Sequence, residues 1–161
     1  MISGRFWINL SKMIVEQFVL TPFQQNTRIV VCEKTAQAIC IDPGEASEAI
    51  AAYVTGCGYD LTAILLTHGH LDHIGGTGFM HRHFPDAEIL IHRDEEDLYY
   101  ALPAQPLLMG VPQQQLAALG FDYEDPPKIT EQNWPAPYDE TRAGDMRKCL
   151  YAILDGCIKF A

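Results

Sequence analysis

Three imidazoles and one carboxylate lie close together in the stretch from Thr67 to His73, which reads Thr-His-Gly-His-Leu-Asp-His. This stretch follows directly on the apolar run at residues 61–66, which indicates a strand buried on both faces. Neutral imidazole and carboxylate are ligands that suit zinc, and less selectively iron or manganese. The pattern therefore predicts a metal site at the carboxyl end of that strand. None of the six histidines of the chain lies beyond His92, so no later histidine can complete the site.

The spacing within the stretch separates two pairs of candidate ligands. His68 and His70 are two residues apart, so on extended backbone their side chains point to the same side and can bind one ion. Gly69 between them lets the backbone approach closely. Asp72 and His73 follow a turn, so we expect them to face a different direction and to serve a second ion. Two ions about 3.5–4 Å apart can share and activate a hydroxide.

Other polar residues carry weaker signals. Asp42 is either a turn former whose carboxylate accepts backbone hydrogen bonds, or a group that orients a metal-bound histidine. His81 and His83 are two apart on an expected helix and do not share a face, so we interpret them as surface residues. His92 precedes an acidic run that helix capping and solvation explain. We expect the five cysteines to be small apolar core residues.

Composition restricts the class of protein. A length of 161 residues, with 48% hydrophobic and 20% charged residues, favours one globular domain. The net charge of -10 disfavours a nucleic-acid partner, because an acidic surface repels phosphates. An odd number of cysteines without a CxxC pair indicates reduced thiols. We find no signal peptide and no run of roughly 20 apolar residues that could span a bilayer, and therefore expect a cytoplasmic protein without a membrane partner.

The order of elements predicts an α/β fold with helices packed on a sheet. Alternating and continuous apolar runs predict strands, and apolar residues at helical spacing predict helices. We expect residues 103–112 to form a loop, and a proline-rich region with little periodicity to follow from residue 121. The last run, at residues 149–160, is mildly apolar and fits either one strand or one helical turn. The strands are expected at residues 14–20, 27–32, 37–41, 61–66 and 88–91, and the helices at residues 45–55, 77–83, 94–102 and 112–120.

The stretch that carries the histidines matches the THxHxDH signature of the metallo-β-lactamase superfamily. The hairpin that ends in Ile-Asp-Pro-Gly at residues 41–44, the helix after it and the next strand resemble the first half of that fold. Residues 23–27 and 102–105 resemble hydroxyacylglutathione hydrolases, also called glyoxalase II. The resemblance covers roughly residues 13–134. It implies the first half of an αββα sandwich, apparently truncated, with an N-terminal extension at 1–12 and a dissimilar tail at 135–161.

The resemblance also implies a site and a reaction. His68 and His70 would bind one zinc ion, and Asp72 and His73 a second. A metal-bound hydroxide, oriented by Asp72, would attack the carbonyl of a thioester such as a glutathione conjugate. Iron or manganese are the alternative metals.

The later part of the chain departs from the family pattern. The family's later histidines are absent, and Asp145 is only a superficial match to its bridging aspartate, because no apolar strand precedes it. We hypothesise that residues from about Trp134 onward come from a truncated or shifted reading frame. Half a sandwich would expose apolar sheet, which favours self-association.

Three functions remain open on the sequence alone. The first is a metal-dependent thioester hydrolase whose binding of metal is weak, since two protein ligands per ion is a low count. The second is an inactive remnant with an incomplete metal site. The third is an iron-dependent oxygenase that resembles the persulfide dioxygenases, which use the same early ligands.

Overall fold

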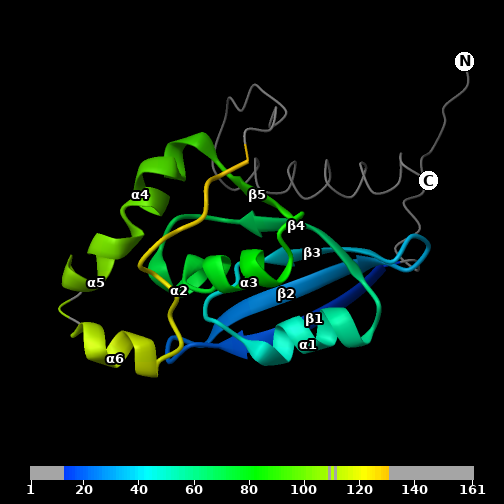
Figure 1. Ribbon diagram of the computed structural model, residues 1–161, viewed down its shortest axis with the longest axis horizontal. Helices are drawn as coiled ribbons and strands as arrows, with labels where there is room; N and C mark the ends of the chain where they lie inside the picture. Colours follow the sequence, from blue (N-terminus) through cyan, green and yellow to red (C-terminus); the bar gives the residue numbers. More distant parts are fainter. Residues whose placement is uncertain (1–12, 109, 111, 131–161) are drawn as a thin grey trace, which may run out of the picture.

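The computed structural model describes residues 13–108, 110 and 112–130, which form one five-stranded sheet with helices against it (Figure 1). The strands lie in the sheet in their chain order. They are β1 (Met13–Leu20), β2 (Gln25–Cys32), β3 (Gln37–Ile41), β4 (Asp60–Leu66) and β5 (Glu88–Ile91). The first three are antiparallel neighbours, whereas β3, β4 and β5 run parallel. The predicted α/β class and all five predicted strands are confirmed.

The parallel half of the sheet explains the sequence of β4. This strand lies between β3 and β5, and its residues from Ala63 to Leu66 are all buried, which agrees with its largely apolar sequence. Parallel neighbours need a crossover connection. The crossover from β3 to β4 contains α1 (Glu48–Gly56), and the one from β4 to β5 contains α2 (Leu71–Ile74) and α3 (Thr77–His83). Because β3 and β4 are parallel neighbours, their carboxyl ends meet at one edge of the sheet.

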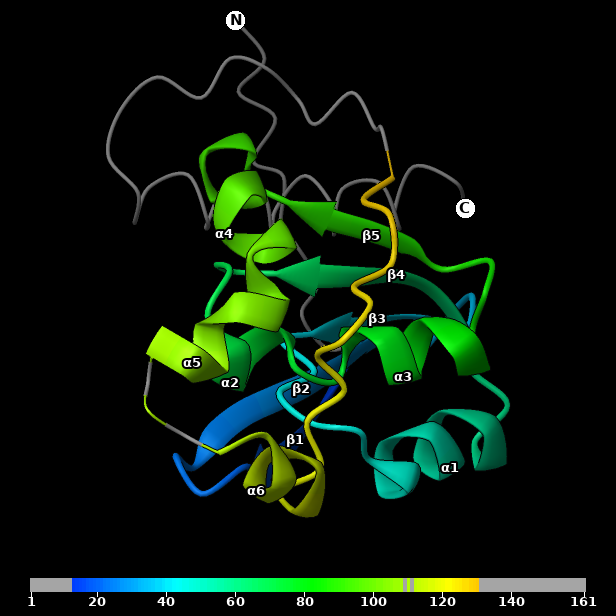
Figure 2. The ribbon, with the colours of Figure 1, turned by 60° about the vertical axis from the view of Figure 1, so that its left-hand side comes forward.

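The helices α1, α2 and α3 lie over one face of the sheet (Figure 2). Their apolar side chains, among them Ile50, Ile74 and Met80, join alternate residues of the strands in the main core. Cys40 and Ile64 are fully buried members of that core. A second, smaller cluster lies among the intervening residues of β2 to β5, on the other face.

The region after β5 differs from the expected helix and loop. A helix was expected over 94–102 and a loop over 103–112. The chain instead forms short helical turns, because Pro103 and Pro106 each suit the first turn of a new helix and not the interior of a long one. The expected loop is therefore wrong over its first half. The turns are η2 (Arg93–Glu95), α4 (Glu96–Tyr100), η3 (Leu102–Ala104) and α5 (Gln105–Leu108), followed by α6 (Gln113–Ala118).

Some other expectations are corrected or lie elsewhere. Cys40 is buried as expected, but Cys57 is exposed because it caps the end of α1. The expected extension at 1–12 and tail at 135–161, with Asp145, lie outside the described residues. Each helix within the described ranges is too short or too polar to cross a membrane.

A tight junction of two turns fixes α2 and α3 against the end of β3. The Gly76 amide donates to the Pro43 carbonyl oxygen at 2.7 Å. A Cβ atom at Gly76 would collide with the Glu45 carbonyl group, which belongs to the backbone and cannot rotate away. The close approach therefore requires glycine at this position.

The substitution Gly76→Ala is expected to lower the free energy of unfolding by about 1–3 kcal/mol, because the added methyl group overpacks the junction. Gly56→Ala is the matched control, since nothing lies within 4 Å of a Cβ atom there. Chemical denaturation of both variants measures the difference. Equal stabilities would show that the junction yields without cost.

Candidate metal centre

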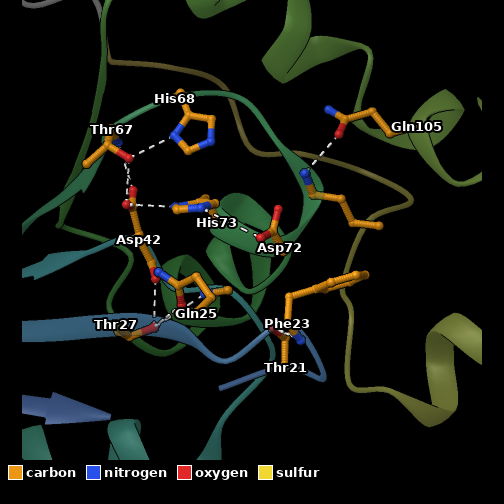
Figure 3. Close-up of polar contacts among 12 residues, drawn as sticks. Thr21, Phe23, Gln25, Thr27, Asp42, Thr67, His68, Asp72, His73 and Gln105 are labelled. Carbon is orange, nitrogen blue, oxygen red and sulfur yellow. Dashed lines mark hydrogen bonds and ion pairs between the residues drawn. The ribbon is translucent and has the colours of Figure 1, made fainter. Parts of the chain in front are cut away.

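The candidate site lies at the edge of the sheet where β3 and β4 end. Asp42 follows β3 directly, and Thr67 and His68 follow β4. The Asp42 amide donates to the Leu65 carbonyl oxygen at 3.0 Å, which ties the two strand ends together. Asp42 has a φ of 50°, a conformation that turns its side chain out of the line of the strand. Figure 3 shows the side chain pointing toward Thr67 and His73.

The buried Asp42 carboxylate accepts three hydrogen bonds at the centre of the site (Figure 3). Its Oδ1 accepts from the Thr67 amide at 2.7 Å, and its Oδ2 from the Thr67 hydroxyl at 2.6 Å. The same Oδ2 contacts His73 Nδ1 at 3.0 Å. Of the two roles that the sequence allowed for Asp42, the structure therefore favours the orientation of a histidine.

This network assigns the tautomers of two histidines. Asp42 can only accept, so His73 Nδ1 carries the proton and Nε2 keeps its lone pair. The single Thr67 hydroxyl proton goes to Asp42, so the 3.0 Å contact between that hydroxyl oxygen and His68 Nδ1 requires a proton on the ring nitrogen. His68 Nε2 then also keeps its lone pair. Both rings are thus prepared to bind a metal ion through Nε2.

The surroundings shift the pKa values of these two histidines in opposite directions. Burial lowers the pKa of His68, and the neighbouring His73 and His70 rings lower it further. Burial also lowers the pKa of His73, but the hydrogen bond that its Nδ1 donates to Asp42 and the charges of Asp42 and Asp72 outweigh it, so that the net shift is upward. His68 is therefore held neutral, the form that binds metals.

The structure brings the four predicted ligands into one group. The ring centroids of His68 and His70 lie 4.7 Å apart, and those of His68 and His73 lie 4.0 Å apart. Asp72 Oδ2 lies 3.6 Å from His73 Nε2. The expectation that His73 faces away from the first pair is therefore corrected, because α2 begins directly after His70 and its first turn brings the His73 ring back against His68.

Two observations decide how a metal ion would fit. The donor types and the free Nε2 atoms of His68 and His73 suit zinc, iron or manganese. Within the described ranges, however, no three His, Cys, Asp or Glu side chains surround a point that could hold an ion. The donors thus fit in chemistry but are few in number, and a catalytic zinc ion usually has three protein ligands.

We call residues 67–73 the histidine loop. Two side chains from the region after β5 form hydrogen bonds to its backbone, and the sequence analysis predicted neither contact. Buried Gln105 donates from Nε2 to the carbonyl oxygens of Gly69 and Leu98, at 2.7 and 3.0 Å, and accepts from the Leu71 amide at 2.8 Å. Glu95 accepts from the Gly69 amide at 3.2 Å. The backbone on both sides of His70 is thereby fixed.

Gly69 itself is required by this packing. A Cβ atom there would lie 2.9 Å from the Tyr99 amide nitrogen and 3.0 Å from Leu98 Cβ. We expected Gly69 to allow a close approach of the backbone, and the structure shows that the close approach is to α4.

The remaining histidines lie away from this group. His83 is exposed on α3, as expected. His81 is partly buried, and its Nδ1 has no hydrogen-bond partner, so the expectation of a surface residue holds only in part. His92 Nδ1 accepts from the Asp94 amide at 3.2 Å, so His92 itself caps the turn that the acidic run begins.

Comparisons with known proteins agree with this geometry. The sequence profile of the metallo-beta-lactamase superfamily matches residues 20–145. The chain is 33% identical over 100 residues to hydroxyacylglutathione hydrolase GloC of Haemophilus influenzae, which covers 62% of this chain and 47% of that protein. It is 39% identical over 67 residues to the hydroxyacylglutathione hydrolase of Yersinia enterocolitica, covering 42% of this chain and 26% of that protein. The chain thus spans less than half of each relative.

Solved structures show the same fold. The BLEG-1 B3 metallo-beta-lactamase superposes with a TM-score of 0.56 at 27% identity, covering 74% of this chain and 54% of that one. The protein TTHA1623 in a di-iron-bound form also gives a TM-score of 0.56, at 25% identity, covering 77% and 57%. Both similarities extend over most of the described residues.

In the metal-free chain, Asp42→Asn is expected to remove the upward shift of the His73 pKa, because the amide carries no charge. In the wild type, His73 has a higher pKa folded than unfolded, so its contribution to stability is complete below about pH 6.5 and is lost as the pH rises through the folded pKa. Nuclear magnetic resonance titration of the ring protons measures the shift. Asp86→Asn, at an exposed turn, is the control. An unchanged His73 pKa in Asp42→Asn would contradict the assigned hydrogen bond.

Gln105→Leu is expected to lower the free energy of unfolding by at least about 2 kcal/mol, because it leaves two buried carbonyl groups and one amide without partners. Gln17→Leu, on exposed β1, should change it by less than about 0.5 kcal/mol. Denaturant titrations compare the two variants. Similar losses in both would mean that Gln105 does not hold the loop.

Proposed function

The chain belongs to the metallo-beta-lactamase superfamily, and we propose that its histidine loop supports metal-dependent hydrolysis of a glutathione-type thioester. The observation that carries the proposal is the Asp42 network, which leaves the Nε2 atoms of His68 and His73 free as ligands. The similarity to hydroxyacylglutathione hydrolases supplies the substrate class. Because the chain spans under half of those relatives, the activity of the whole protein is part of the proposal.

The residues divide into those that hold metal and those that position them. His68 and His70 would hold one ion, and Asp72 and His73 a second. When bound, such an ion supplies a Lewis acid that lowers the pKa of water and polarises the thioester carbonyl. The Asp72 carboxylate accepts a hydrogen bond from the attacking water and orients it. Asp42 and Thr67 keep the imidazole protons on Nδ1, away from the reacting groups.

Zinc is the first metal to test and iron the second. The imidazole and carboxylate donors suit both ions. The similarity to TTHA1623, solved in a di-iron-bound form, supports the inclusion of iron. We expect weak binding and slow turnover, because two protein ligands per ion is below the usual count.

A second candidate is a fold that keeps the histidine loop but does not turn over substrate. The observation that favours it is the lack of three converging donors within the described ranges. It differs from the first candidate in lacking thioesterase activity.

The purified chain, after incubation with zinc or iron, is expected to retain about one or two metal equivalents and to hydrolyse lactoylglutathione slowly. His68→Ala/His70→Ala should reduce both by at least about tenfold, because two donors are removed. Elemental mass spectrometry and loss of thioester absorbance measure the two quantities. His83→Ala, which removes an exposed histidine of α3, is the matched control.

The outcomes separate the candidates. Metal without turnover, lost in the double variant, supports the second candidate. No retained metal in the wild type refutes the metal-dependent hydrolase. Turnover that survives the double variant also refutes it, since the reaction would then not use the histidine loop.

A further inference from the structure

The face of the sheet opposite the helices carries an apolar patch of its own. We name this set the outer-face patch, and each member comes from a different position on β2 to β5 and is only 3–9% exposed. Met13 and Ile41 pack against its rim. The patch consists of Val30, Ile39, Ala63, Leu65 and Leu90.

No described helix contributes to the outer-face patch. The apolar residues of α1, α2 and α3 all belong to the main core on the other face. Figure 2 shows these three helices together on that one side of the sheet. Contact with water would cost the patch about 25 cal/mol for each Å² of apolar surface. A cover that removes the patch from water would therefore be favourable.

The described chain ends beside this face. The Thr130 amide donates to the Ile89 carbonyl oxygen at 3.1 Å, and the Thr130 hydroxyl accepts from the Ile89 amide at 3.0 Å. Thr130 is thus attached to β5, the edge strand that carries Leu90. Crossing five strands takes roughly 19 Å, and the 15 residues from 131 to 145 can extend over about 50 Å. The following residues can therefore reach any part of the patch.

The sequence after residue 145 has a suitable pattern. Apolar residues recur there at the spacing of one helical face, and the polar residues Lys148, Asp155 and Lys159 occupy the opposite positions. A stripe of this kind needs an apolar partner. The apolar positions are Met146, Cys149, Leu150, Ile153, Leu154 and Cys157.

We propose that residues 146–157 dock through this apolar stripe on the outer-face patch and so serve as the cover of the sheet in this chain. The proposal does not depend on the metal site. The segment occupies a surface that would otherwise be open to a second copy of the chain. Apolar burial on both partners supplies the driving force.

The native cysteines test the docking in the full-length chain. Cys149 and Cys157 lie on the stripe, whereas Cys57 is exposed and Cys40 is fully buried in the main core. Burial also raises the pKa of the Cys40 thiol, which slows its alkylation further. Under native conditions, N-ethylmaleimide should modify Cys149 and Cys157 at least about tenfold more slowly than Cys57. Peptide mass spectrometry over time measures each rate.

A pair of matched variants separates docking from general folding. Ile153→Glu places a charge on the stripe and should bring the rates of Cys149 and Cys157 up to that of Cys57. Cys40 should stay protected, which shows that the sheet is still folded. Lys148→Glu adds the same residue on the polar side and should leave the rates of Cys40, Cys57 and Cys157 unchanged.

Each outcome decides the proposal. Modification of Cys149 and Cys157 as fast as Cys57 in a monomeric chain would overturn it. Protection that appears only at concentrations where size-exclusion chromatography shows a dimer would overturn it in favour of a second copy as the cover. Protection that Ile153→Glu does not relieve, with Cys40 still protected, would also overturn it, because the stripe would then not be the contact.

Discussion

The structure of the candidate site depends on a single buried carboxylate. Asp42 accepts hydrogen bonds from the Thr67 amide, the Thr67 hydroxyl and the His73 ring, and through Thr67 it also determines the proton position on His68. A buried carboxylate is costly unless such donors surround it. The arrangement therefore restricts the backbone at the ends of β3 and β4 and the tautomers of two histidines together. Loss of the carboxylate would affect the geometry and the protonation of the site in one step.

The sheet makes this concentration of contacts possible. Asp42 and Thr67 are 25 residues apart, yet parallel pairing of β3 and β4 brings their backbones to the same edge. The histidine loop then rests on Gln105 and Glu95, which approach from the short helical turns after β5. Rigid support of this kind is what a binding site on a loop requires, because positional freedom weakens both affinity and orientation. Glu95 lies on η2 and Gln105 begins α5, so two of the short turns after β5 each supply a side chain that supports the site.

The two faces of the sheet differ in which segments cover them. One face is covered by the helices that connect the strands, as expected for parallel pairing with short crossovers. The other face carries its own apolar cluster, and the cover that we infer for it comes from a segment remote in sequence. In this inference, burial of apolar surface stabilises the docking of that segment on the sheet.

The sequence by itself determined the class of the fold, all five strands and the identity of the candidate ligands. These features depend on local periodicity and on a dense motif, and both can be recognised within a few residues of the chain. The turns between 103 and 108 were missed because each proline could end one helix or begin the next, and only packing decides between these. The role of Asp42 was open because its partners lie 25 and 31 residues away. Gln105 belonged to the run 102–105 that resembled hydroxyacylglutathione hydrolases, but its residue type did not reveal its hydrogen bonds to Gly69, Leu71 and Leu98. The tertiary structure alone decided these points, because a hydrogen bond between distant residues exists only after the sheet has brought them together.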